Sequence, residues 1–283
     1  MKLAISNIAW APQEARAAYG LMQAAGFTGL EIAPGLAFAG EEDRVAPGEA
    51  AIAAFKADLA EFGLSAVSMQ SLLFGVSGAQ MFGSATERAA LEHGLVRAIR
   101  LAERLEIPNL VFGSPGNRSY PADMAPSEAW AQAADVFRQL GDVAKCAGTK
   151  LAVEPNPAAY GTNFLTTVAE TADFVVMVDH PAITLNYDMG ALHMNGEIGE
   201  ANALYARAQG KVSHIHISEP QLATAPADPD VLTKVAAAVL AQGYDRWFSI
   251  EMRAPESDAL PTMAACLERT AKAISAARNT ASA

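Results

Sequence analysis

Short apolar runs alternate with longer amphipathic stretches along the whole chain. The short runs are rich in β-branched and aliphatic residues and predict eight strands, at 2–10, 29–34, 65–70, 109–114, 150–156, 182–188, 211–218 and 246–253. The longer stretches predict helices between the strands, among them 86–105 and 127–146, with a closing helix at 259–277. Eight strand–helix repeats are the number that closes a (β/α)₈ TIM barrel. An open doubly wound sheet is the alternative, but no GxGxxG follows the first strand.

The lengths of the connections favour the barrel. Links from helix to strand are tight, whereas links from strand to helix are long and rich in Gly and Pro, at 34–48, 113–126, 155–164, 189–199 and 219–229. Long loops on one face are how a barrel builds a site at the carboxyl ends of its strands. No low-complexity linker divides the sequence, so we expect residues 1–283 to form a single domain, with residues 278–283 as a frayed tail.

Composition and charge limit the kinds of binding partner and the cellular location that we expect. The chain has 283 residues, 51% of them hydrophobic, and a net charge of −11, which opposes binding to nucleic acid or to an anionic membrane. No apolar run approaches the roughly 20 residues that a membrane span requires, and "MKLAISNIAW" lacks the features of a signal peptide. Cys146 and Cys266 have no CxxC spacing, as in proteins of a reducing compartment. We therefore expect a cytoplasmic protein with no nucleic-acid or membrane partner, and leave a homo-oligomer open.

Polar side chains of one parity interrupt the last four predicted strands near their carboxyl ends, where both faces of a barrel strand are normally apolar. They are Glu154 and Asn156, then Asn186 and Asp188, then His214, His216 and Ser218, and finally Ser249, Glu251 and Arg253. Two glutamates, an aspartate and a histidine that converge on one barrel mouth would repel one another unless a cation neutralises them.

Carboxylate oxygens with one imidazole suit a divalent ion, and the lack of thiolates argues against a structural zinc site. We predict one divalent ion held by Glu154, Asp188, His216 and Glu251, with Mn²⁺ expected and Mg²⁺, Co²⁺ or Zn²⁺ as alternatives. An ion-pair network in the core is the competing interpretation. His214 is either a core histidine satisfied by hydrogen bonds or a partner that orients a ligand.

At these residues the sequence resembles the xylose isomerase-like TIM barrels, which include sugar isomerases, ketose 3-epimerases and endonuclease IV. The likeness runs from "AISNIAW" and "GFTGLEIAP" to the series "VEPN", "NYDMGALH", "HIHISE" and "IEMR". In the ketose 3-epimerases, one divalent ion is held by Glu, Asp, His and Glu, which by motif are Glu154, Asp188, His216 and Glu251. The resemblance implies that Glu154 and Glu251 are also the catalytic acid–base pair, one on each face of the sugar carbon. It further implies a small sugar substrate and an enediolate stabilised by the metal.

Three departures from that family concern the substrate. The tagatose and psicose epimerases carry a histidine three residues after the metal aspartate, a glutamate six after the first metal glutamate, and an arginine six after the metal histidine. This chain has Ala191, Tyr160 and Leu222 at those positions, and its nearest histidine is His193. The resemblance therefore implies that the metal and proton-transfer residues are kept while the substrate contacts differ.

Six further side chains are candidates for contacting a substrate: His193, Arg253, Asn156, Gln70, Trp10 and Arg118. Arg118 lies in the turn-rich loop "GSPGNRSYP", which either binds hydroxyls or an anion or is only a connector. Trp10 forms either an apolar wall for a sugar ring or part of the core. Arg253 either reaches the mouth or pairs with a metal-site carboxylate, and His193 either bonds a substrate oxygen or caps a helix.

The leading hypothesis is a metal-dependent isomerase or epimerase that moves a proton at a carbon next to the carbonyl of a sugar. One alternative is a lyase or dehydratase that acts on a keto-sugar or sugar acid with the same site. Another is a non-enzymatic barrel that binds a sugar with the help of its metal. DNA repair of the endonuclease IV kind is disfavoured, because strands two and three end in Glu31 and Gln70 and not in histidines, and because the chain is acidic.

Overall fold

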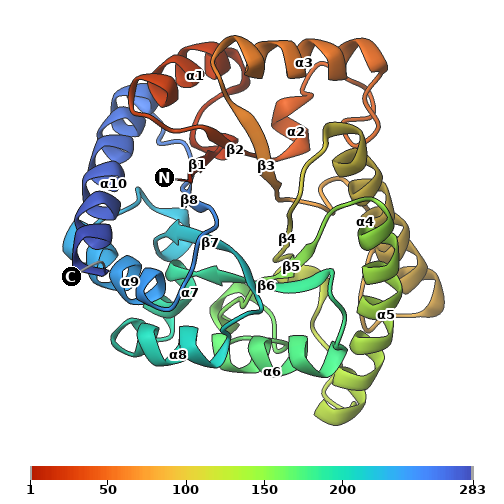
Figure 1. Cartoon of the computed structure of the whole chain (residues 1–283). Helices are drawn as coiled ribbons and strands as arrows, with labels where there is room; N and C mark the ends of the chain where they lie inside the picture. The colour runs from red at the N-terminus through yellow and green to blue at the C-terminus, as the bar shows by residue number, and fades with distance from the viewer. Residues whose placement is uncertain (1, 282–283) are drawn as a thin grey trace.

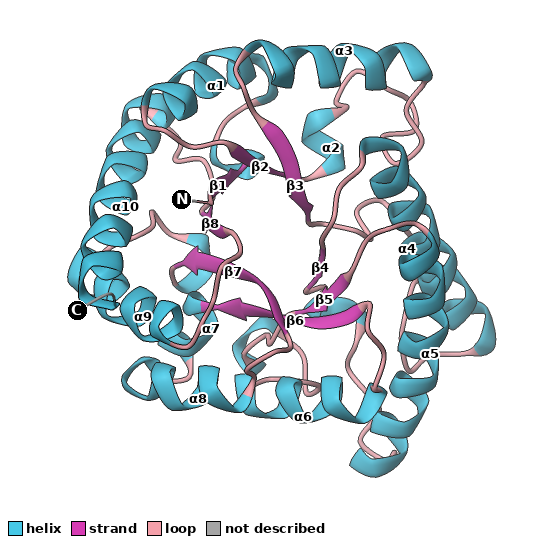
Figure 2. Cartoon of the chain, in the orientation of Figure 1, coloured by secondary structure: helices cyan, strands magenta, loops and turns pink. Residues whose placement is uncertain are grey.

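The computed structural model describes residues 2–281 and forms a closed barrel of eight parallel strands that follow one another in chain order. The strands are β1 (Leu3–Ser6), β2 (Gly29–Ile32), β3 (Ser65–Met69), β4 (Leu110–Phe112), β5 (Leu151–Val153), β6 (Ile183–Asp188), β7 (Val212–Ser218) and β8 (Phe248–Glu251). They form an inner ring, and the longer helices form an outer layer around it (Figures 1 and 2). The predicted TIM barrel is confirmed.

Each strand is followed by a helix that covers the outside of the ring. These helices are α1 (Ala15–Ala24), α3 (Glu49–Glu61), α4 (Ala85–Leu105), α5 (Pro126–Cys146), α6 (Val168–Val178), α8 (Ala201–Arg207), α9 (Pro229–Ala241) and α10 (Ala259–Ala281). Two short helices, α2 (Pro34–Ala37) and α7 (Met189–Met194), lie within the long strand-to-helix connections. Residues 278–281 form the end of α10, and 282–283 lie outside the described residues, so the frayed tail at 278–283 stays a prediction. Within residues 2–281, every helix is too short or too polar to cross a membrane.

Helix α4 illustrates how local sequence sets these elements. Ser84 begins the helix with a capping box, in which its hydroxyl accepts from the Glu87 amide and the Glu87 carboxylate accepts from the Ser84 amide at 2.7 Å. The helix buries one stripe, including Leu91 and Leu95, against the barrel. It ends at Leu105, because the next residue, Glu106, has a left-handed backbone (φ 59°) that cannot continue the helix.

The first strand is shorter than predicted, because the chain turns at Asn7. The Asn7 side chain accepts from the Ala33 amide at 2.7 Å and donates to the Ala33 carbonyl at 3.3 Å, which joins the loops after β1 and β2. Trp10 consequently leaves the barrel and packs edge-on against Tyr19, with 6.4 Å between ring centroids.

A layer of small polar side chains crosses the barrel interior, from the amino ends of β6 and β7 past the start of β4 to the second half of β3. Thr184 and Ser213 share a hydrogen bond of 2.7 Å, Ser213 donates to Asn109 at 2.7 Å, and Asn109 donates to Ser68 at 3.1 Å. All four residues are buried. The β2–β3 and β6–β7 pairings shift register beside Ser68 and Ser213, where one strand carries an extra residue. The metal candidates lie above this layer, toward the carboxyl ends of the strands.

Candidate metal centre and active site

The four predicted metal ligands meet at the carboxyl ends of β5 to β8. Glu154 directly follows β5, Asp188 ends β6, His216 lies in β7 and Glu251 ends β8. Strand register helps to align them, because Asp188 pairs with His216 and Glu251 pairs with Ser218. The four side chains can each place one ligand atom within 4.8 Å of every other, and all four residues are buried.

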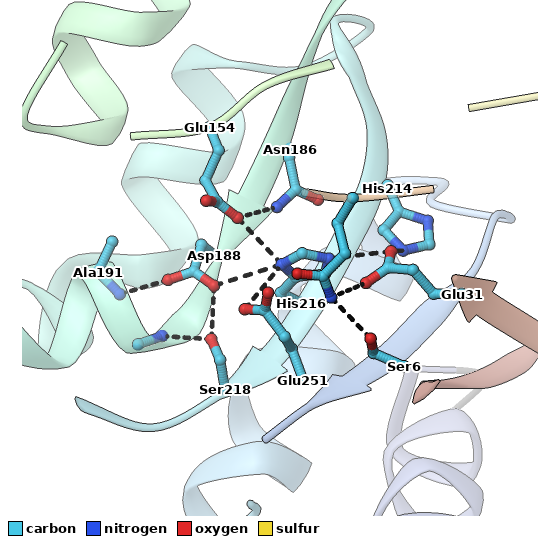
Figure 3. Close-up of polar contacts among 12 residues, drawn as sticks. Ser6, Glu31, Glu154, Asn186, Asp188, Ala191, His214, His216, Ser218 and Glu251 are labelled. Carbon is cyan, nitrogen blue, oxygen red and sulfur yellow. Dashed lines mark hydrogen bonds and ion pairs between the residues drawn. The ribbon is translucent and has the colours of Figure 1, made fainter. Parts of the chain in front are cut away.

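His216 Nδ1 is the centre of this group (Figure 3). It lies 3.0 Å from Glu154 Oε1, 3.2 Å from Glu251 Oε2 and 3.7 Å from Asp188 Oδ2. Among the described residues no hydrogen bond of good geometry satisfies this buried nitrogen. One imidazole nitrogen facing three carboxylates is the donor set that a divalent cation takes. The residues therefore fit one divalent ion.

The charges in this group support the same conclusion. Burial alone would lower the pKa of His216, but the carboxylates of Glu31 and Glu251 outweigh burial and raise that pKa well above its usual value. Burial raises the pKa of Glu251 to about 7. Without a cation the group is thus stabilised by protons, and a bound divalent ion would replace them.

Asp188 is held in place by two neighbouring elements. Its Oδ1 accepts from the Ala191 amide at 2.5 Å and caps α7, while its Oδ2 accepts from the Ser218 hydroxyl at 2.5 Å. The same hydroxyl accepts from the Gly190 amide at 2.8 Å. The carboxylate therefore has a fixed orientation toward His216 before any ligand binds.

Glu154 is held equally firmly. Asn186 donates to its Oε1 at 2.8 Å, and Asn156 donates to its Oε2 at 3.0 Å. Gly113, after β4, leaves the space that this carboxylate needs, because a Cβ there would lie 2.6 Å from Glu154 Oε2. Arg118 donates to the Glu154 carbonyl at 2.8 Å and so anchors the backbone.

Glu31 forms a second buried layer behind the candidate ligands (Figure 3). Its Oε2 lies 3.1 Å from His216 Nε2 and 2.9 Å from His214 Nε2. Gln70 donates to Glu31 Oε1 at 2.9 Å and to the Ser6 hydroxyl at 2.7 Å. Burial alone would raise the pKa of the Glu31 carboxyl, but His216 and His214 outweigh it and hold that pKa well below its usual range.

This arrangement gives Glu31 a role that the sequence reasoning missed. A carboxylate that accepts from His216 Nε2 fixes the tautomer in which Nδ1 carries the lone pair. The structure also places His214 Nε2 beside the same oxygen, and its two alternative roles stay predictions. The available signal was a carboxylate inside the apolar run "GLEI".

Two cavities meet above the candidate ligands, and both are lined by Ser114, Glu154 and Glu251. We call the larger one, of about 390 Å³, the polar compartment; Asn156 and Arg253 line it. The smaller one, of about 320 Å³, is the Phe74 compartment, named after a lining residue, and Gln70 lines it as well. Three of the predicted substrate-binding residues thus reach the site.

The other three do not line these compartments. Arg118 is fully buried, and burial lowers the pKa of its guanidinium to about 10. It donates to backbone carbonyls and does not line either cavity. Trp10 lines a separate hollow between α1 and α3. His193 lies in the last turn of α7, with Nε2 3.9 Å from Glu219 Oε2. Their expected substrate contacts stay predictions.

Comparisons with known proteins agree with this architecture. A sequence profile of the xylose isomerase-like TIM barrel family matches residues 20–273. No curated protein matches the chain. Among solved structures, an L-ribulose 3-epimerase is 19% identical with a TM-score of 0.77, covering 100% of this chain and 97% of that chain. The 3-keto-D-glucoside 4-epimerase from E. coli is 16% identical with a TM-score of 0.75, covering 99% of each chain. A D-psicose 3-epimerase with D-tagatose from Clostridium cellulolyticum H10 is 15% identical with a TM-score of 0.75, again covering 99% of each chain.

Proposed function

The chain belongs to the xylose isomerase-like TIM barrel family, and on this basis we propose that it is a divalent-metal-dependent isomerase or epimerase of a sugar or sugar derivative. One observation carries the proposal: three buried carboxylates converge on the unsatisfied Nδ1 of His216 at the floor of an open site. The similar solved structures named above include epimerases of L-ribulose, of D-psicose and of a 3-keto-D-glucoside. We propose Mn²⁺ as the ion, and a cytoplasmic location in keeping with the free Cys146 and Cys266.

In this proposal Glu154, Asp188, His216 and Glu251 would hold the cation. Bound there, it would polarise the carbonyl and the neighbouring hydroxyl of a sugar and stabilise the negative charge that develops on them. Side chains of the protein would bind the substrate and transfer the proton. Asn156 and Arg253 line the polar compartment and are placed to donate hydrogen bonds to sugar oxygens.

Glu154 and Glu251 are the proposed acid–base pair. They come from β5 and β8, three strands apart around the ring, and both line both compartments. One carboxylate takes the proton from the carbon next to the carbonyl, and the other delivers a proton to its opposite face. Asn186 and Asn156 hold the Glu154 carboxylate in position throughout. The reverse reaction exchanges the two roles.

The test is a panel of aldoses and ketoses incubated in D₂O with Mn²⁺-loaded protein. We expect deuterium at the carbon next to the carbonyl in at least one sugar, with a new epimer or isomer detected after protein and metal are removed. Chelation should abolish both signals, and restored Mn²⁺ should return them. Exchange followed by loss of water would favour the lyase alternative. Metal-loaded protein that exchanges no sugar would favour the sugar-binding barrel.

A further inference from the structure

The two compartments of the site are large enough to hold separate groups. Their volumes of about 320 and 390 Å³ each lie in the range of small-molecule sites, roughly 300–1,000 Å³. They share Glu154 and Glu251, so a group in either compartment begins beside the proposed acid–base pair. A sugar that reacts between these carboxylates can extend to both sides of them.

The linings of the compartments differ in chemistry. Asp188, Glu219 and Arg253 line the polar compartment, which suits a group rich in hydroxyls. Leu73, Phe74 and Val111 line the other, together with neutral polar residues. Among the described residues, the shared glutamates are the only charged side chains that line the Phe74 compartment. The Phe74 compartment therefore offers its occupant a nonpolar surface at Leu73, Phe74 and Val111, with uncharged polar groups beside it.

Phe74 is the most exposed apolar residue of this lining. Its side chain is 60% exposed, and the other large exposed hydrophobic residues of the described chain, Val176 and Met177, lie on the outer helix α6. A turn sets the backbone at Phe74: its amide donates to the Ser71 carbonyl at 3.0 Å, and Ser71 has a left-handed backbone (φ 57°). Gly35 leaves room for the ring, because a Cβ there would lie 3.1 Å from Phe74 Cδ1.

An aromatic ring at the edge of the site offers a flat apolar surface to the C–H face of a second ring. We propose that the substrate is a keto- or aldo-sugar that carries a second ring-sized group, such as another sugar, on one of its other hydroxyls. The reacting ring occupies the polar compartment, and the second ring stacks on Phe74. This inference rests on the proposed function for the identity of the reacting group, but not for the contact with Phe74.

The experiment compares D-fructose with three two-ring ketoses, turanose, lactulose and isomaltulose, which place a second sugar on different hydroxyls. Deuterium uptake from D₂O by Mn²⁺-loaded protein gives kcat/KM for each sugar. We expect at least one two-ring ketose to exceed D-fructose by about tenfold, the size of one aromatic stacking contact. Phe74→Ala should remove that advantage, and Phe74→Tyr should keep it. Met177→Ala, which removes an exposed apolar side chain far from the site, is the matched control.

Two results would overturn the inference and leave the proposed function intact: D-fructose exchanging faster than all three two-ring sugars, or Phe74→Ala lowering every sugar by the same factor. If no sugar exchanges at all, the proposed function fails, and binding decides the inference. Saturation-transfer NMR on Mg²⁺-loaded protein then measures binding of the same four sugars. Two-ring binding that Phe74→Ala weakens about tenfold would support the inference. Absent or Phe74-independent binding would end it.

Discussion

Replacing Glu31 with glutamine keeps the shape of the side chain but removes its charge beneath the candidate metal site. Glu31 Oε2 lies 3.1 Å from His216 Nε2 and 2.9 Å from His214 Nε2, and all three side chains are fully buried. A hydrogen bond to a charged group contributes about 1.5–3 kcal/mol, and a loss of about 1.4 kcal/mol is tenfold in binding. We therefore expect Glu31→Gln to weaken Mn²⁺ binding roughly 10- to 100-fold, since His216 would no longer be held with Nδ1 toward the carboxylates.

Competition between the protein and a fluorescent chelator measures the Mn²⁺ affinity, and a thermal melt without metal shows whether the variant is folded. Glu256→Gln, an exposed change in the loop after β8, is the control and should bind Mn²⁺ as the unmodified chain does. Wild-type affinity in a folded Glu31→Gln variant would refute the orienting role. Equal losses in both variants would show that the effect is general electrostatics and not the geometry of His216.

Four further outcomes follow from the site. Glu154→Gln and Glu251→Gln should each lower turnover about 10²–10⁴-fold, the range for a positioned acid–base group. One of the two variants can still exchange deuterium without forming epimer. Near-normal turnover with metal bound would contradict the two-base mechanism. Gly113→Ala should weaken Mn²⁺ binding, because its Cβ would lie 2.6 Å from Glu154 Oε2, and unchanged affinity would mean that the carboxylate moves freely. Mn²⁺ affinity should rise from pH 6 to pH 8 with release of protons, because burial raises the pKa of Glu251 to about 7 and the ion must displace that proton; calorimetry in buffers of different ionisation enthalpy checks the release. His216→Ala should cost more Mn²⁺ affinity than His214→Ala, and equal losses would mean that the ligand was misassigned.

The fold was accessible from sequence because a barrel repeats one simple pattern. Eight apolar runs with amphipathic stretches between them predict eight strand–helix units, and the structure has them. The exact ends of the elements were not accessible. The first strand stops at Ser6 because Asn7 hydrogen-bonds across to Ala33, a contact between loops that no local pattern reveals.

In the candidate site, too, residues that a local pattern marks could be predicted, and contacts that depend on the tertiary fold could not. Polar residues at strand ends, such as Asp188 and His216, were visible because each interrupts an apolar run. Glu31 interrupts one as well, but its contact with His216 could not be predicted, because the two residues are 185 positions apart and only closure of the barrel brings them together. The burial of Arg118 could not be predicted for a related reason: an arginine in a glycine-rich loop is normally exposed, but here tertiary packing buries it against the Glu154 carbonyl.

The layer of small polar side chains that crosses the barrel interior has a consequence for how the strands align with one another. In an interior filled only with Val, Ile and Leu, mainly packing would oppose a shift of one strand past another, and packing contacts are not directional. Ser213 and Asn109 instead form directed bonds at 2.7 Å, and a slip of one residue would leave buried hydroxyl and amide groups without partners at about 1–3 kcal/mol each. The layer therefore favours one register between strands that are far apart in the sequence. By fixing the height of β7, it also fixes the height at which His216 meets the carboxylates.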